Sequence, residues 1–133
     1  MTKRQLLKKI KSEYIVEKRK ENSYDIVILL NGKKIYVKIL NISLNTILSL
    51  NSKYVWELKK GKISGIRFIT YSSNIINLKD FMKKENKVVI LTKMPYKIFR
   101  QINESDIEDV TNEKLVNNVL LITNPHSIYD FFK

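Results

Sequence analysis

Apolar residues recur at helical spacing at the start of the chain. Thr2 and Gln5 have the spacing of a capping box, in which each side chain accepts a hydrogen bond from the other residue's backbone N–H. The apolar positions that follow fall on one helical face: Leu6, Leu7, Ile10 and Tyr14. The period breaks at Ile15, and residues 14–18 fit a short strand better. The sequence therefore predicts an amphipathic helix that begins after Thr2 and is followed by a first strand.

Two apolar runs joined by Asn31-Gly32 predict a β-hairpin over residues 24–40. Asn-Gly favours a two-residue type I′ turn, because both central positions of that turn need positive φ. With this turn, residues whose numbers sum to 63 lie opposite one another, so that Asp25 faces Lys38. Alternation then predicts one face with Asp25, Val27, Leu29, Tyr36, Lys38 and Leu40, and an opposite face with Tyr24, Ile26, Ile28, Leu30, Ile35, Val37 and Ile39. The second face is almost wholly apolar and must be covered by another element.

The rest of the chain alternates short apolar runs with turn residues. We expect strands at 54–58, 66–71, 87–92 and 119–123, a turn at 59–62, and an irregular strand or loop at 41–50. Helices are expected at 78–84, at 111–118 and after Asn124-Pro125, and residues 105–110 fit either a helix start or a strand. This order predicts a single α+β (mixed α/β) domain over residues 1–133. Its N-terminal helix is followed by a mixed, mainly antiparallel sheet with a central β-hairpin and short flanking helices.

Composition excludes several kinds of site. The chain has 133 residues with no cysteine and one histidine, His126. Disulfides and thiolate metal sites are therefore excluded, and a histidine-based zinc site or a Ser-His-Asp triad is not expected. No apolar run has the length of a membrane span, and the charged start is not followed by the apolar stretch of a signal peptide. We therefore expect a soluble, cytoplasmic protein without a metal or other cofactor.

The charge of the chain is strongly positive and unevenly distributed. The formal net charge is +12, and Lys (21) far exceeds Arg (4). A lysine-rich proteome would explain part of this excess, but Asp and Glu together number only 13. Residues 1–100 carry a net charge of +16, and residues 101–133 carry one of −4. This distribution indicates either a polyanionic partner or a charge match within the molecule.

Two groups of basic residues are candidates for phosphate contacts. The first group lies on and after the N-terminal helix: Lys3, Arg4, Lys8, Lys9, Lys11, Lys18, Arg19 and Lys20. The second, near the aromatic residues Tyr96 and Phe99, comprises Lys83, Lys84, Lys87, Lys93, Lys97 and Arg100. Phosphate contacts make binding strongly salt-dependent, and the rarity of arginine argues against bidentate readout of bases. The sequence therefore predicts binding to DNA or RNA through backbone phosphates, with solvated surface lysine as the alternative.

The end of the chain carries an acidic group and an aromatic terminus. The acidic residues are Glu104, Asp106, Glu108, Asp109 and Glu113. They lack the glycine and the spacing of a calcium loop, so carboxylates near a helix N-terminus are the simpler explanation. Ile128, Phe131 and Phe132 are expected to pack on the body of the protein. Residues 104–113 and the aromatic terminus are also candidates for contact with a protein partner.

The helix, the first strand and the Asp25 hairpin, with the later helix-strand units, resemble the core of the PD-(D/E)XK, or restriction-endonuclease-like, superfamily over residues 1–100. In that pattern an Asp lies in the first hairpin strand and a (D/E)-X-K triplet in the second. Tyr24-Asp25 matches the position of the Asp, and Val37-Lys38-Ile39-Leu40 matches the segment that holds the triplet. The resemblance implies a nuclease-like fold that contacts nucleic acid.

The triplet is altered in a way that predicts loss of catalysis. Lys38 occupies the position of the second carboxylate, and Leu40 occupies that of the catalytic lysine. Phosphodiester hydrolysis by such a site needs clustered carboxylates that hold Mg²⁺ and orient water. By the register above, the Lys38 ammonium would lie about where the metal would sit and would neutralise Asp25. The two residues are therefore either a plain cross-strand ion pair or a relic active site that now binds without catalysis.

Three functions follow from these observations. The leading hypothesis is a non-catalytic nucleic-acid-binding domain with a degenerate nuclease-like fold. The first alternative is a metal-dependent nuclease with a displaced carboxylate, in which Mg²⁺ would be the cofactor. The second is a protein-interaction or regulatory module that uses residues 104–113 or the aromatic terminus.

Overall fold

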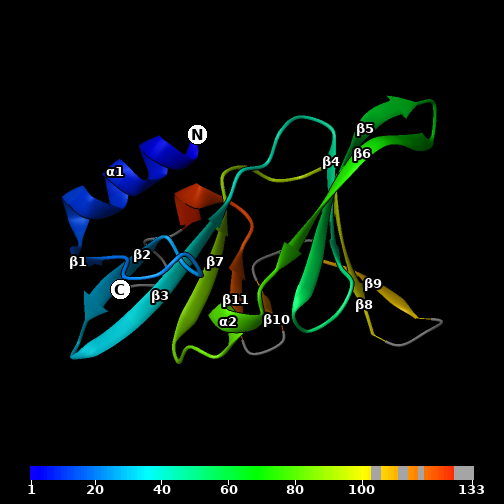
Figure 1. Cartoon of the computed structure of the whole chain (residues 1–133). Helices are drawn as coiled ribbons and strands as arrows, with labels where there is room; N and C mark the ends of the chain where they lie inside the picture. Colours follow the sequence, from blue (N-terminus) through cyan, green and yellow to red (C-terminus); the bar gives the residue numbers. More distant parts are fainter. Residues whose placement is uncertain (103–105, 111–113, 117–118, 128–133) are drawn as a thin grey trace.

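Two β-sheets and one three-turn helix form most of the computed structural model, which describes residues 1–102, 106–110, 114–116 and 119–127 (Figure 1). The helices are α1 (Lys3–Glu13), α2 (Lys79–Met82) and a 3₁₀ turn at Pro125–Ser127. The strands are β1 (Ile15–Lys18), β2 (Ile26–Leu30), β3 (Lys33–Leu40), β4 (Thr46–Leu50), β5 (Val55–Ser64), β6 (Arg67–Asn77), β7 (Lys87–Leu91), β8 (Lys97–Gln101), β9 (Ile107–Asp109), β10 (Lys114–Val116) and β11 (Val119–Ile122).

The first sheet has six strands in the order β1-β2-β3-β7-β11-β10. Its strands β1, β2 and β3 are antiparallel neighbours, whereas β3, β7 and β11 run parallel. Asn31 and Gly32 have φ angles of 52° and 77°, as a type I′ turn requires. Ile28 pairs with Ile35 and Ile26 with Val37, so the predicted hairpin and its register are confirmed.

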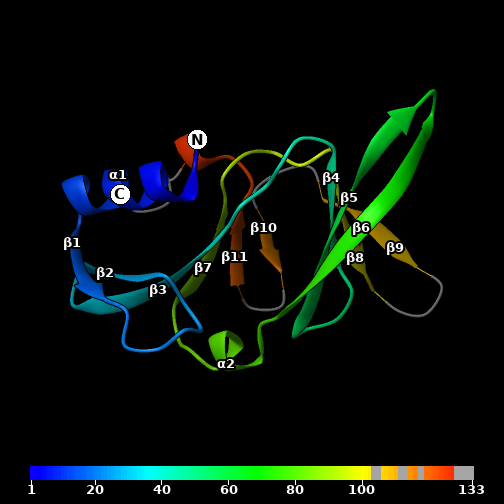
Figure 2. The same cartoon turned by 45° about the horizontal axis from the view of Figure 1, so that its top comes forward.

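The second sheet has five strands in the order β6-β5-β4-β8-β9. Its strands β4 and β8 are parallel, and β5 and β6 form a long antiparallel hairpin. The two sheets face each other across one core cluster, to which the second sheet contributes Leu48, Trp56 and Ile98 and the first sheet Val89 and Leu121. Both views show the β5–β6 hairpin projecting away from the rest of the second sheet (Figures 1 and 2).

α1 covers the other face of the first sheet. Its capping box is present as predicted: Thr2 Oγ1 accepts a hydrogen bond from Gln5 N at 3.1 Å, and Gln5 Oε1 accepts one from Thr2 N at 2.9 Å. Leu6 and Ile10 are buried in a second cluster with Ile26, Ile28, Val37, Ile39, Val88, Ile90 and Ile122. The predicted apolar face of the hairpin is therefore covered by the N-terminal helix (Figure 2).

The strand alternation fails at the first residues of the hairpin. Tyr24 was expected beside Ile26 but belongs to the cluster between the two sheets, where its ring contacts Tyr36 edge-on at 5.0 Å between centroids. β2 begins only at Ile26, because the chain bends at Asp25. A bend changes the side to which side chains point, so the predicted faces hold for residues 26–40 and not for Tyr24 and Asp25.

The predicted fold class is wrong. The described residues contain eleven strands and only two α-helices, and the strands form two sheets rather than one sheet with a central hairpin. The predicted turn at 59–62 lies inside β5, and β8 was not predicted. Residues 114–116 of the predicted helix 111–118 form β10, and residues 107–109 form a strand, which was one of the two expectations there.

Candidate functional site

Asp25 is the residue that matches the nuclease Asp. Its side chain is buried, and each of its two carboxylate oxygens contacts another group of the protein. Its side chain is 4% exposed, and its Oδ1 lies 2.6 Å from Lys3 Nζ of α1. Its Oδ2 accepts a hydrogen bond from Ile39 N at 2.6 Å. A buried carboxylate is stable only when such partners replace water. The sequence therefore places one acid in a site where both of its oxygens are engaged by the protein itself.

The contact with Ile39 follows from the way β2 begins. Asp25 N donates to Val37 O at 2.8 Å, which is the last main-chain hydrogen bond of the hairpin on this side. Ile39 lies two residues further along β3, so its N–H points to the same edge, where β2 no longer offers a carbonyl. The Asp25 carboxylate takes the place of that carbonyl. This acid therefore extends the β2–β3 ladder by one hydrogen bond.

The predicted Asp25–Lys38 ion pair is wrong, because the cation that contacts Asp25 is Lys3. The observed register of β2 and β3 ends at the pair Ile26–Val37, so Lys38 has no partner in β2. Lys38 is half-buried on β3 and takes no part in the ion pairs of the described residues. Leu40, which stands in place of the catalytic lysine, is buried in the cluster between the sheets. At the two altered positions of the triplet the structure therefore has a half-buried cation, Lys38, and a core side chain, Leu40.

A basic groove runs between α1 and the first sheet. It consists of two open depressions of about 750 and 550 Å³ that share Leu7 and Lys11. The first is lined by Thr2, Lys3, Arg4, Leu7, Lys8, Lys11 and Asn41, and the second by Leu7, Lys11, Val16, Glu17, Lys18, Arg19, Asp25 and Ile26. We call these residues the α1 groove.

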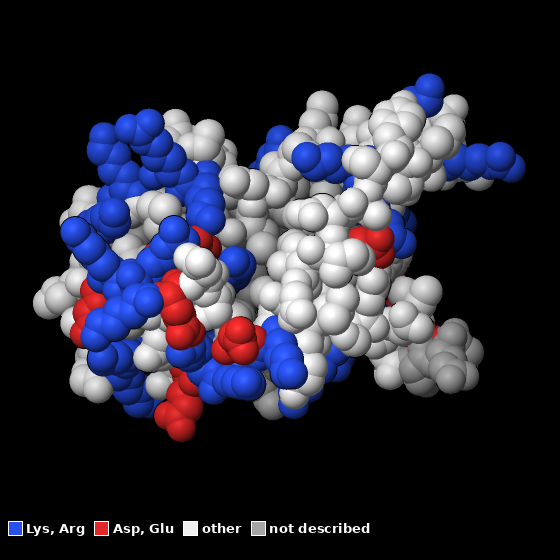
Figure 3. Space-filling view, viewed as in Figure 1, with Lys and Arg blue, Asp and Glu red and all other residues white. Residues whose placement is uncertain are grey.

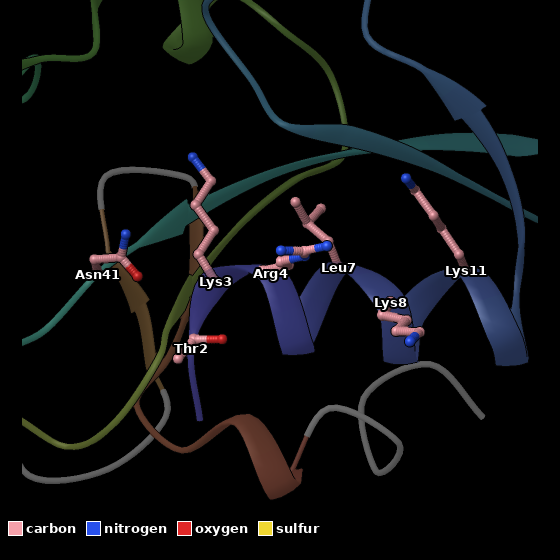
Figure 4. Close-up of a pocket in the computed structure, with 7 residues that line it drawn as sticks. All are labelled: Thr2, Lys3, Arg4, Leu7, Lys8, Lys11 and Asn41. Atoms are coloured by element: carbon pink, nitrogen blue, oxygen red, sulfur yellow. The ribbon is translucent and has the colours of Figure 1, made fainter.

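The side chains of the groove point in two directions (Figure 4). Lys3, Leu7 and Lys11 extend from α1 toward the strands of the first sheet. Arg4 and Lys8 lie along the outer side of the helix, away from those strands. The groove therefore presents cations both inside the depression and at its rim.

Most cations of the groove have no acidic partner among the residues that the structure describes. Within the described residues, the ion pairs of this region join Lys3 to Asp25 and Lys34 to Glu17, the latter at 3.3 Å. These two pairs engage both acids of the groove. The groove cations without an ion-pair partner among residues 1–102, 106–110, 114–116 and 119–127 are Arg4, Lys8, Lys11, Lys18 and Arg19. Of the first predicted group, Lys3 and these five residues come together in the groove, whereas Lys9 and Lys20 do not line it.

The second predicted group is not brought together on one surface. Lys83 and Lys84 line two further depressions near α2, and Lys87 Nζ donates to Lys84 O at 3.1 Å. Lys93 follows β7, while Lys97 and Arg100 lie on β8 in the second sheet. Lys97 Nζ lies 5.9 Å from the Phe99 ring centroid, and Arg100 pairs with Glu108 at 3.8 Å. These six residues therefore belong to separate parts of the molecule.

Lys84 is held by an acid and two aromatic rings. Its Nζ lies 2.8 Å from Glu21 Oε1 and 5.6 and 5.3 Å from the ring centroids of Tyr24 and Tyr36. The hydrogen bond with Lys84 is the main reason why the pKa of Glu21 lies below its usual value, with a second hydrogen bond from Ser23. The same hydrogen bond raises the pKa of Lys84, against a smaller opposing effect of desolvation. The Lys84 ammonium therefore already has an acidic partner and two aromatic partners within the protein.

The acidic group of residues 104–113 does not form a site in the described part of the chain. Glu108 pairs with Arg100 across β8 and β9, and Asp106 and Asp109 are exposed. Glu104 and Glu113 lie outside the described residues, as do Ile128, Phe131 and Phe132 of the aromatic terminus. Across the described ranges, no three Asp, Glu, His or Cys side chains come together as metal ligands. Neither described helix is long and apolar enough to cross a membrane.

Sequence reasoning missed the basic residues of the β5–β6 hairpin. Lys60, Lys62 and Arg67 are exposed there, and they take no part in the ion pairs of the described residues. A usable signal was in the sequence, because no acid occurs between Glu57 and Asp80. Figure 3 shows basic side chains at the end of this hairpin without acidic neighbours, whereas basic and acidic groups are interspersed over the first sheet.

Comparisons of the chain with protein-family models, with curated proteins and with solved structures found no match. Its function must therefore be argued from the geometry and charge of its own surface.

Proposed function

We propose that the protein is a non-catalytic nucleic-acid-binding protein, which holds phosphates of DNA or RNA in the α1 groove. The observation that carries this proposal is the charge of the groove. Five of its cations have no ion-pair partner in the part of the chain that the structure describes, while its two acids, Asp25 and Glu17, are already paired with lysines. A polyanion would meet uncompensated positive charge there and no free carboxylate.

The contacts of Asp25 support the non-catalytic part of the proposal. Metal-dependent hydrolysis needs carboxylate oxygens that are free to hold Mg²⁺. Both oxygens of Asp25 are engaged, and the Lys3 ammonium lies 2.6 Å from one of them, at ion-pair distance. A cation of the protein thus takes up the charge that a metal would otherwise balance. This arrangement favours binding over the alternative of a nuclease with a displaced carboxylate.

The degenerate nuclease-like origin remains part of the proposal. α1, β1 and the β2–β3 hairpin follow one another in the order on which the resemblance to the restriction-endonuclease-like superfamily rests. In this interpretation, Lys3 replaced the metal beside Asp25, and a former active-site groove kept its attraction for phosphate. The proposal also includes a cytoplasmic location, where both DNA and RNA would be available in a cell without a nucleus.

The test is a titration of fluorescein-labelled 20-nucleotide DNA and RNA, single-stranded and duplex, monitored by anisotropy at 50 and 200 mM salt. If all five unpaired cations contact phosphates, the groove alone should make affinity for duplex DNA fall about 500-fold between these salt concentrations. In the Arg4→Gln/Lys8→Gln/Lys11→Gln variant two groove contacts remain, and the contribution of the groove to the fall should be only about 12-fold.

A matched control removes the same charge elsewhere. Lys33, Lys53 and Lys79 are exposed, lie outside the groove and take no part in the ion pairs of the described residues. Their triple Gln variant should keep the salt dependence of the wild type. Equal loss in both variants would mean that net charge, rather than the groove, determines binding. Absence of binding at 50 mM salt would overturn the proposal, and Mg²⁺- or Mn²⁺-dependent cleavage lost in Asp25→Asn would overturn its non-catalytic part.

A further inference from the structure

The β5–β6 hairpin continues beyond the sheet to which it belongs. β4 pairs with β5 only from Glu57 to Lys60, whereas β5 and β6 remain paired as far as Ser64 and Arg67. Residues 61–70 therefore form a two-stranded ribbon beyond the part of β5 that pairs with β4, and we call it the β5–β6 arm. At about 3.4 Å per residue, its four residue pairs extend about 14 Å from the sheet. Figures 1 and 2 show the arm projecting from the body of the protein.

Gly61 fixes the direction of the arm. The pairing of β5 with β6 shifts register between Lys60 and Gly61, so a bulge lies at the base of the arm. A Cβ atom at Gly61 would lie 2.0 Å from Ile69 O, which is closer than any real contact. Gly61 N also donates to Asn45 O at 3.1 Å. The sequence thus builds a defined base for the arm.

The two faces of the arm differ in chemistry. Residues paired across a hairpin share a face, and successive pairs alternate. Ile63 and Phe68 lie on one face, where the Phe68 ring stacks on Tyr96 at 5.6 Å between centroids. The opposite face carries Lys62, Ser64, Arg67 and Ile69. The face that does not pack on Tyr96 is therefore cationic and rich in hydrogen-bond donors.

We propose that the β5–β6 arm enters the major groove of B-form DNA, with Lys62 and Arg67 on phosphates or guanine edges. This major groove is about 12 Å wide and 8.5 Å deep and admits a two-stranded ribbon, whose strands lie about 4.8 Å apart. The arm is long enough to reach its floor. The fully exposed Ile66 at the tip offers an apolar contact to thymine methyl groups.

The charge of the arm selects a polyanion as its ligand. No acid occurs between Glu57 and Asp80, and Glu57 itself is hydrogen-bonded by Asn51 Nδ2 at 3.1 Å. The major groove of duplex RNA is too deep and narrow for side chains to read, so the ribbon fits DNA and not RNA. The inference rests on the proposed function only in taking nucleic acid as the ligand, because it uses a separate surface and separate residues.

The experiment compares three double variants of the full chain: Lys62→Gln/Arg67→Gln in the arm, Arg4→Gln/Lys8→Gln in the α1 groove, and Lys33→Gln/Lys79→Gln as the neutral control. Each is titrated by anisotropy against a 20-base-pair DNA duplex, the RNA duplex of the same sequence and the single DNA strand. Circular dichroism verifies that each variant is folded. We expect the arm variant to lose affinity for duplex DNA about tenfold, with RNA and single strands unchanged within twofold. Its salt slope should fall by about 0.9 for each of the two cations that contacts a phosphate, and so by about 1.8 if both do.

Each of the other outcomes contradicts the inference about the arm, the proposed function of the α1 groove, or both. Unchanged affinity of the arm variant for duplex DNA, or equal losses with duplex RNA and single strands, overturns groove entry by the arm. If the groove variant binds all nucleic acids normally while the arm variant loses duplex DNA, the proposed function of the α1 groove fails and the inference stands. If the wild type binds none of the three probes, both fail. Binding to vesicles with 30% phosphatidylserine that is stronger than binding to DNA, and lost in the arm variant, assigns the arm to membranes instead.

Discussion

The α1 groove and the β5–β6 arm both present positive charge, but they differ in what holds that charge in place. In the groove, Lys3 is bonded to the buried Asp25, and the helix that carries it packs on the first sheet through Leu6 and Ile10. In the arm, Lys62 and Arg67 sit on a two-stranded ribbon, which is anchored to the rest of the protein at its base and through Phe68.

This difference separates two ways in which a protein can present cations to a polyanion. A groove built on a packed helix is rigid, so its charges meet phosphates at fixed spacing, and changes to its buried members affect stability. An arm contributes little to the core, so its cations can be changed at almost no cost to the fold. Substitutions of the buried groove residues should therefore affect folding, whereas substitutions of the exposed cations of the arm should affect binding alone.

The largest effect is expected from Asp25→Ala in the groove. This change leaves Ile39 N–H without its acceptor and leaves Lys3 without a partner in a site where the acid is 4% exposed. Together these losses should lower the free energy of unfolding by about 3 kcal/mol, or the melting temperature by about 10 °C. Thermal unfolding followed by circular dichroism measures this.

Two further variants, for which smaller losses of stability are expected, serve as comparisons for Asp25→Ala. Asp25→Asn keeps an acceptor for Ile39 N–H and loses only the charge, so it should lower the free energy of unfolding by about 1 kcal/mol. Lys62→Gln in the arm should change the free energy of unfolding by less than about 0.5 kcal/mol. A loss from Lys62→Gln as large as that from Asp25→Ala would remove the contrast between the two regions.

The next largest effect is expected from Gly61→Ala, which tests the base of the arm. The new Cβ would overlap Ile69 O, so β6 must shift away from β5. The free energy of unfolding should fall by about 2 kcal/mol, as it does at other overpacked sites. Gly65→Ala at the turn is the matched control, because a Cβ there has no atom within 4 Å, although its φ of +63° adds some strain. If Gly61→Ala left both stability and duplex DNA binding unchanged, the arm would not depend on this bulge.

The first sheet could largely be predicted from the sequence, and the second only in part: the strands expected at 54–58 and 66–71 overlap β5 and β6, but the length of both strands and the presence of β8 were not predicted. β2, β3 and β7 are apolar runs, and the Asn31-Gly32 turn defines a register that needs no tertiary information. β5 instead contains Lys59, Lys60 and Lys62 around Gly61, a composition typical of turns. These residues are extended because β4 and β6 supply hydrogen bonds on both sides up to Lys60, and such a tertiary effect outweighs local preference.

The contacts of Asp25 in the candidate site likewise depend on tertiary packing, which the local sequence does not predict. The predicted register placed Lys38 opposite Asp25, but the observed pairing ends at Ile26 and Val37, because the chain bends at Asp25. The bend turns the carboxylate toward α1, where Lys3 is 22 positions away in the sequence. Which cation neutralises the acid is decided by how a helix packs on a sheet, and no local pattern encodes that packing.

A smaller effect is expected from Thr2→Ala, which removes the N-cap of α1. Thr2 Oγ1 would no longer accept from Gln5 N, and loss of such a cap costs about 1 kcal/mol. Because Lys3 is the first residue of α1, fraying there should also loosen its contact with Asp25. Hydrogen exchange of the α1 amides should increase, whereas exchange in β5 and β6 should not. Thr70→Ala, on the arm, is the control that should leave α1 unchanged.

The smallest effect is expected from Lys84→Gln, and it should depend on pH. The Glu21–Lys84 contact lowers the pKa of Glu21 from its usual 4.5, so its contribution to stability is present above pH 4.5 and is lost as pH falls through the lowered value. The same contact raises the pKa of Lys84 from 10.5, so that contribution is present below pH 10.5 and is lost as pH rises through the raised value. The difference in melting temperature between the wild type and Lys84→Gln should therefore be greatest between these limits and should shrink on either side.

Two other lysines, Lys83 next to Lys84 and Lys62 on the arm, serve as controls for this profile. Lys83 pairs with Asp80 at 3.6 Å, but both side chains are more than two-thirds exposed, so Lys83→Gln should have no measurable effect at any pH. Lys62→Gln should behave in the same way, because no acid in the described residues pairs with Lys62. A pH-dependent loss in Lys62→Gln that matched Lys84→Gln would mean that the arm, like the first sheet, has a carboxylate partner. Its cations would then not be free for DNA, and the two regions would no longer differ.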